Sequence, residues 1–90
     1  MTKTEIIEAL ASRVGLTKAD AKRAVDGVFG AVADALARGE KVTLTGFGTF
    51  EVRHRKARMG RNPQTGAPLH IPETDYPAFR AGKALKDVVR

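Results

Sequence analysis

His54 and His70 are the side chains in this sequence best suited to acid–base or metal chemistry near neutral pH. Neither has a serine, a cysteine or a carboxylate at the spacing of a recognisable catalytic motif, and together they form no known metal-ligand pattern. The absence of cysteine also excludes disulfides and thiolate nucleophiles. We therefore predict that the chain is not an enzyme, that it has no catalytic or metal-binding residues, and that it takes no cofactor and no small-molecule substrate.

Positive charge gathers around His54 instead. Five of the nine residues from 53 to 61 are Arg or Lys. Residues 1–52 hold seven basic and seven acidic residues, whereas residues 53–90 hold nine basic and three acidic ones and so carry the whole net charge of +6. A basic excess confined to one segment indicates a surface for a polyanion such as nucleic acid.

The basic segment lies within a region with the pattern of β-structure. Between residues 41 and 52, apolar and polar residues alternate as they do in a strand. The turn composition RNPQTG follows at residues 61–66, and a return strand is expected over residues 67–76. The four prolines of the chain all fall between residues 63 and 77, which excludes a central sheet strand and favours an edge strand or a free ribbon. We therefore predict a β-ribbon arm over residues 53–75.

Gly46-Phe47-Gly48 interrupts the first alternation. The triplet would fit a dinucleotide-binding loop only if a helix followed it, and here a strand is expected to follow. We interpret the two glycines as allowing a tight bend that buries Phe47.

The remaining segments have helical patterns. A capping box, Thr-Lys-Thr-Glu at residues 2–5, precedes an amphipathic segment that ends at Gly15. A second threonine followed three residues later by an acid, at residues 17–20, precedes another amphipathic segment that ends at Gly39. A short helix is expected near residues 82–89. The sequence thus predicts a helical hairpin, then β-structure, then a short helix.

Gly27 and Gly30 lie inside the second predicted helix, where each glycine costs about 1 kcal/mol relative to alanine. Two interpretations stay open: tolerated drift, or the close approach of a helix from a second subunit. A chain of 90 residues buries only about 60–65% of its surface on folding, so help from a partner subunit is plausible.

The predicted arm has the chemistry of a DNA-groove binder. A two-stranded ribbon is narrow enough to follow a groove, although it enters the minor groove, about 6 Å wide, only by opening it. Pro63 at the tip is rigid, apolar and without an N–H to satisfy, so it can wedge between base pairs and bend the duplex. The cations that can pair with phosphates along the ribbon are Arg53, Arg55, Lys56, Arg58 and Arg61.

The stretch GFGTFEVRHRKARMGRNPQT, from Gly46 to Thr65, resembles the signature of the HU/IHF family of bacterial histone-like DNA-bending proteins. The resemblance extends over the whole chain, to PAFRAGKALKDVV near its end. This family is a known example of minor-groove architectural binding, so the proline wedge belongs to the resemblance as much as to the residues. The implied fold class is α+β: a two-helix N-terminal hairpin, a three-stranded antiparallel sheet with a protruding β-ribbon arm and a short C-terminal helix, in an intertwined dimer. The implied domain is single, with a dimer body at 1–52 and 76–90 and an arm at 53–75.

The resemblance also assigns roles by position in the motif. Pro63 would be the intercalating residue. The arm contacts to DNA would include Arg55, Arg58, Arg61 and Asn62. The saddle between the arms would be lined by Lys3, Arg80, Lys83 and Lys86. The dimer core would contain Phe29, Phe47, Phe50 and Phe79.

The implied function is histone-like, largely sequence-independent binding and bending of double-stranded DNA, with compaction of the nucleoid. Ala81 stands where IHF subunits usually have proline, which favours an HU-like homodimer. The alternatives are an RNA- or ribosome-binding basic protein, an IHF-like subunit of a sequence-preferring heterodimer, or an assembly protein whose ribbon docks on an acidic partner. The N-terminus has acidic residues where a signal peptide has an apolar block, and no apolar run approaches membrane-span length, so we expect a cytoplasmic, nucleoid-associated protein that binds no membrane.

The return strand departs from the family pattern. Residues 67–76 hold no Lys or Arg, and acids stand at Glu73 and Asp75. A hairpin centred between residues 63 and 64 would place Glu73 near His54 and Asp75 near Val52, with arginines as neighbours. We hypothesise that these acids pair with the arginines at the arm base and repel phosphate there, so that the arm grips DNA mainly with its outer half, Lys56 to Arg61. The alternative, which stays open, is that both are ordinary solvated acids that only aid solubility.

Overall fold

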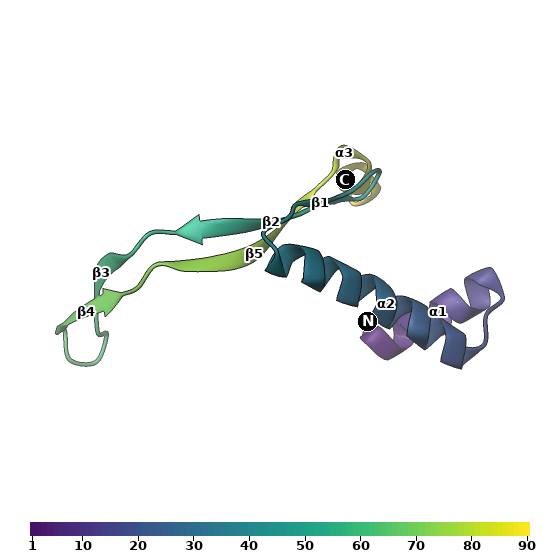
Figure 1. Cartoon of the computed structure of the whole chain (residues 1–90), viewed down its shortest axis with the longest axis horizontal. Coiled ribbons are helices and arrows are strands. Elements are labelled where there is room, and N and C mark those ends of the chain that lie inside the picture. The colour runs from purple at the N-terminus through teal and green to yellow at the C-terminus, as the bar shows by residue number, and fades with distance from the viewer. The chain divides into compact units, whose positions relative to one another are not determined.

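The computed structural model describes residues 1–90, and the chain divides into two compact units, residues 1–34 and residues 35–90. Helix α1 spans Lys3–Val14 and helix α2 spans Lys18–Ala37. They are followed by strands β1 (Val42–Leu44), β2 (Gly48–Arg55), β3 (Arg58–Arg61), β4 (Pro68–Ile71) and β5 (Thr74–Ala81), and by helix α3 (Lys83–Val88), as Figure 1 shows.

The predicted helix boundaries are confirmed. Thr2 and Glu5 form a reciprocal capping box, in which the Glu5 N–H donates to the Thr2 hydroxyl at 3.3 Å. The Asp20 N–H donates to the Thr17 hydroxyl at 3.1 Å, so a threonine side chain also caps the start of the second helix. Gly15 ends α1 in the left-handed conformation, at φ 72°, which glycine adopts without strain. Local sequence chemistry alone thus sets the start and end of the first helix and the start of the second.

The first unit has a small core. Ile7 and Ala11 of α1 pack against Ala21 and Val25 of α2. Farther along the apolar face of α2, Phe29 is 53% exposed. No atom of this chain outside the helix's own backbone lies within 4 Å of the point where a Cβ would stand at Gly27 or Gly30. The first unit therefore supplies no close neighbour for these glycines, and the two interpretations of them stay open.

The second unit contains a three-stranded antiparallel sheet and a two-stranded ribbon. The sheet has the order β1-β2-β5, and β3 pairs with β4 to form the ribbon. Beyond the sheet, β2 and β5 lead into this ribbon (Figure 1). Pro77 lies in the edge strand β5, opposite Val52, and Pro68 begins β4. Both positions agree with the prediction that the prolines occupy an edge strand and a free ribbon.

The bend between β1 and β2 differs from its prediction. Gly46 supplies a positive φ of 84°, as a tight bend requires, but Phe47 is 48% exposed rather than buried. Its ring contacts Phe79 in a tilted pair at 5.7 Å between centroids, and about half of the side chain stays exposed. Gly48 has a different role, because a Cβ there would stand 2.7 Å from the Arg80 carbonyl oxygen. It permits close packing of β2 on β5.

The register of the arm also differs from its prediction. His54 pairs with Asp75, and the ribbon continues in the same register beyond an interruption at residues 56–57 and 72–73. The interruption coincides with Pro72, which has no N–H for the ladder. The tip is closed by the Asn62 N–H donating to the Ala67 carbonyl at 2.9 Å. The hairpin is therefore centred between residues 64 and 65 rather than between 63 and 64.

Candidate nucleic-acid interface

The β2–β5 pair separates apolar from basic side chains. Because side chains alternate along a strand and paired residues share a face, Phe50 lies on one face with Phe79, its ring 4.8 Å away. Arg53, Arg55 and Arg80 lie on the opposite face. We call these three residues the arginine face.

Two residues that the sequence-based reasoning missed organise the arginine face. Glu51 contacts both Arg53, at 3.6 Å, and Arg80, at 3.8 Å. The guanidinium of Arg55 lies over the ring of Tyr76, 4.9 Å from its centroid. Arg53 and Arg80 thus share one carboxylate, whereas the charge of Arg55 is uncompensated. The correct register pairs Tyr76 with Arg53 and would have placed Tyr76 on the arginine face. Glu51 stands two positions before Arg53 in β2, and this spacing alone would have placed it on the same face.

The cations of the ribbon do not share one face. Arg58 pairs with Ile71 and Arg61 pairs with Pro68, an odd number of positions apart, so their side chains leave opposite faces. Gly60 lies between them, and a Cβ there would stand 3.0 Å from the Ile71 Cδ1 atom. Positive charge is therefore available on both faces of the ribbon.

The tip loop is held by its own side chains. The Asn62 carboxamide oxygen accepts from the Gln64 N–H at 2.9 Å, and the Arg61 guanidinium donates to the Gly66 carbonyl at 3.1 Å. The Gly66 N–H donates to the Asn62 carbonyl at 2.7 Å. Pro63 is exposed at the tip. Asn62 and Arg61, which we predicted as DNA contacts, thus also fix the shape of the loop that presents Pro63.

The four residues predicted to line a saddle fall in different units. Lys83 and Lys86 are exposed on α3 and lie three residues apart, so both are on one side of the helix. Arg80 belongs to the same unit, whereas Lys3 belongs to the first unit. Lys3 lies 2.6 Å from Asp26, and this contact lowers the pKa of the Asp26 carboxyl. The charge of Lys3 is therefore already paired, and the common saddle surface stays a prediction.

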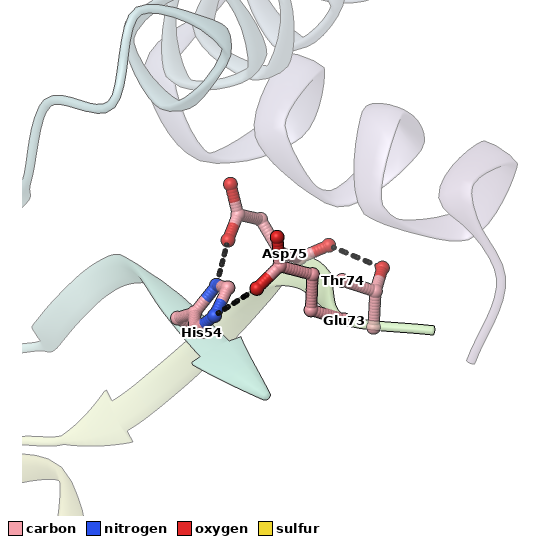
Figure 2. Close-up of polar contacts among 4 residues, drawn as sticks. All are labelled: His54, Glu73, Thr74 and Asp75. Carbon is pink, nitrogen blue, oxygen red and sulfur yellow. Dashed lines mark hydrogen bonds and ion pairs between the residues drawn. The ribbon is translucent and has the colours of Figure 1, made fainter. Parts of the chain in front are cut away.

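The acids of the arm base do not contact the arginines, so the arginine partners that we hypothesised for them are wrong, whereas the predicted proximity of Glu73 to His54 is confirmed. Asp75 Oδ1 lies 2.8 Å from His54 Nδ1, and Glu73 Oε2 lies 3.4 Å from His54 Nε2 (Figure 2). The hydrogen bond to Asp75, with the charges of both acids, raises the pKa of His54. Asp75 shares a face with His54, its cross-strand partner, whereas Arg53 and Arg55 lie on the other face, so the acid cannot reach them. The register shift moves Asp75 from Val52 to His54 without changing this face.

Two further findings bear on the class of site. No group of three or more His, Cys, Asp or Glu side chains is arranged to hold a metal ion. None of the helices has the length and apolar character needed to cross a membrane.

Comparison with known proteins gives full-length matches. The family described as bacterial DNA-binding protein matches residues 1–90. The chain is 58% identical to DNA-binding protein HU of Geobacillus stearothermophilus and to that of Staphylococcus aureus (strain COL), over 90 residues and 100% of each chain. Among solved structures, it is similar to an Anabaena HU–DNA cocrystal structure, with a TM-score of 0.94, 44% identity and coverage of 99% of this chain and 97% of that one. HU from Thermotoga maritima matches with a TM-score of 0.71 and 33% identity over 100% of both chains.

Proposed function

Because the chain belongs to the bacterial DNA-binding protein family, we propose that it binds double-stranded DNA with little sequence preference and bends it, as an HU-like homodimer. The observation that carries the proposal is the arm: a two-stranded ribbon with uncompensated cations on both faces and an exposed proline at its tip. The likeness to an HU structure solved with DNA supports this proposal.

The homodimer follows from what the single chain leaves uncovered. Phe29 is 53% exposed, Phe47 48% and Phe79 41%, and no large side chain is fully buried anywhere in the chain. A second copy that covered these rings would supply the core that one chain lacks. Phe29, Phe47, Phe50 and Phe79 are therefore proposed as dimer core. Ala81 supports identical subunits over an IHF-like heterodimer.

Phosphate contacts supply most of the binding energy in this proposal. We assign them to Arg53, Arg55, Lys56, Arg58 and Arg61 on the arm, with Lys3, Arg80, Lys83 and Lys86 on the body and with Asn62 beside the tip. These side chains are mostly cations, which bind the backbone without reading sequence. Because the ribbon has cations on both faces, it can approach both phosphate chains that border a groove.

Bending is assigned to Pro63. An apolar ring inserted at a base step unstacks it and kinks the duplex, and the energy is recovered from the additional backbone contacts that the bent DNA makes. The hydrogen bonds of Asn62 and Arg61 hold the loop in shape, so the ring needs little ordering when it binds.

The family gives the chain an architectural role, and we propose that it acts in the nucleoid of the cytoplasm and catalyses no reaction.

RNA binding through the same cations is the second candidate, but the half-buried Tyr76 is occupied by Arg55, and the ribbon offers no exposed aromatic ring for stacking on an unpaired base. Competition between matched DNA and RNA duplexes separates the two.

The test of the function is Pro63→Ala, with Gln64→Ala as the matched control. Gln64 is the next residue of the tip, and alanine keeps the backbone N–H that Asn62 holds. We expect Pro63→Ala to lose most of the bending, read as energy transfer between labelled DNA ends, while its affinity falls less than about tenfold because phosphate contacts remain. Gln64→Ala should bend DNA like the wild type. Normal bending by Pro63→Ala would exclude the wedge, and absence of DNA binding by the wild type would exclude the function.

A further inference from the structure

The contacts of His54 place a titratable cation at the base of the arm. Its two ring nitrogens face two different carboxylates, Asp75 at 2.8 Å and Glu73 at 3.4 Å (Figure 2). Only the doubly protonated imidazolium has an N–H on both nitrogens. In the neutral ring, one nitrogen would present a lone pair to a carboxylate. The arrangement therefore fits the charged form of His54.

The position of this cluster matters as much as its chemistry. The pair of His54 and Asp75 is the last but one in the β2–β5 ladder. Glu73 lies in the interruption between β5 and the ribbon. His54 thus joins the sheet to the segment where the ladder stops. Its side chain leaves the face of β2 opposite Arg53 and Arg55, which contact Glu51 and Tyr76 instead.

Two charged groups, Asp75 and Glu73, contact His54. The hydrogen bond to Asp75 raises the pKa of His54 most, desolvation of the ring opposes it, and the charges of Asp75 and Glu73 add to the increase. The arginines of its own strand lie on the other face. Protonation of His54 therefore changes the charge of this cluster from −2 to −1.

We propose that His54 is a positioning residue for DNA binding: as a cation it holds Asp75 and Glu73 on the face opposite the arginine face and offsets their charge, and DNA affinity falls when it loses its proton. This inference rests on the proposed DNA binding. Residues 53–75 contain five basic and two acidic residues, so the arm has a net charge of +4 with His54 protonated and +3 without. The acids lie on the other face of the same strand pair as the arginine face, and charges act on one another over about 10 Å at moderate salt.

The direction of the pH effect follows from linkage. Because the two carboxylates raise the pKa of His54 above the ordinary histidine value of 6.5, the cluster is fully formed below that value. It is lost as pH rises through the raised pKa. Phosphates brought near the arm favour the same protonated form. DNA affinity should therefore fall with rising pH on the alkaline side of 6.5.

The test measures duplex affinity by fluorescence anisotropy between about pH 6 and pH 8.5 at constant ionic strength, with a labelled linear DNA. We expect wild-type affinity to fall about three- to tenfold over this range, since each arm loses one charge. His54→Gln should give a flat profile at the weak level, and His54→Lys a flat profile at the tight level. His70→Gln, which removes the other histidine, should keep the wild-type profile.

A second readout separates this role from a structural one. Titration of the His54 ring by NMR in the free protein should show a midpoint above 6.5, and Glu73→Gln combined with Asp75→Asn should return it to near that value. The same double variant should bind more tightly at high pH. A flat wild-type profile, or an unchanged profile in His54→Gln, would overturn the inference while leaving DNA bending in place. Absence of DNA binding at every pH would overturn both.

Discussion

The salt dependence of DNA binding should distinguish cations that are already paired within the chain from those that are not. Arg55, Lys56, Arg58 and Arg61 make no ion pair with a carboxylate, whereas Arg53 contacts Glu51 at 3.6 Å. Each phosphate that a cation neutralises contributes about −0.9 to the slope of log K against log salt on duplex DNA. Two arms with four such cations each then give a slope of up to about −7, and three phosphates per arm give about −5.

The informative comparison is Arg58→Gln against Arg53→Gln. The first removes an uncompensated charge from each arm, so the slope should move toward zero by about 1.8. The second removes a charge that Glu51 already offsets, and Arg80 remains beside that carboxylate at 3.8 Å. Its effect should be less than about one unit, because a paired cation releases fewer counterions from DNA.

The assay is anisotropy of a labelled linear duplex between about 50 and 200 mM salt at fixed pH, with circular dichroism to confirm that both variants fold. Equal changes in slope for the two variants would mean that ion pairs within the free chain do not decide which cations meet phosphate. A wild-type slope near −2 would mean that the arms do not clasp the backbone at all.

Three further outcomes follow from the packing. Sedimentation at micromolar concentration should give about twice the chain mass of 9.7 kDa, and a stable folded monomer would refute the homodimer. Gly48→Ala should cost about 1–3 kcal/mol in urea unfolding because its Cβ meets backbone at Arg80, whereas Gly60→Ala meets only a flexible side-chain end and should cost less. Asp26→Asn should lower stability at neutral pH, where the wild-type Asp26 carboxylate is charged and paired with Lys3. Because the pKa of Asp26 lies below the ordinary 3.8, the difference in stability between variant and wild type should vanish as the pH falls through that lowered pKa. The same variant should free Lys3 and so tighten DNA binding.

The helices and strands could be predicted from local signals in the sequence, because each signal acts on residues close to it in the chain. A threonine with an acid three residues on caps a helix whatever surrounds it, as Thr2 and Thr17 do. The prolines placed the ribbon for the same reason, since a missing N–H excludes a central strand in any context. The depth of the aromatic rings could not be predicted in this way. Phe47 and Phe79 lie half exposed in one chain, and we propose that a second copy buries them.

The predicted register of the arm strands was wrong because the composition of a turn does not fix its centre. RNPQTG is compatible with a hairpin centred on either side of Gln64, and the choice is made by backbone hydrogen bonds across the loop, from Asn62 to Ala67 and from Gly66 to Asn62. A shift of two positions in the pairing keeps every side chain on its predicted face, because strand periodicity is two. It nevertheless changes every cross-strand partner, and the partners decide the electrostatics.

At the base of the arm, the net charge of the sequence segment differs from the charge on each face of the strand pair. In the sequence, Glu73 and Asp75 lower the net positive charge of the arm, and a return strand without Lys or Arg suggests weak DNA binding. By face, both acids lie with His54, while Arg53 and Arg55 occupy the other side of β2. Because the screening length at moderate salt, about 10 Å, exceeds the thickness of one strand pair, segregation reduces the repulsion of phosphate without removing it. What remains depends on whether the imidazole bears its proton, so the grip of this arm on DNA is set by the protonation of His54 as well as by its number of arginines.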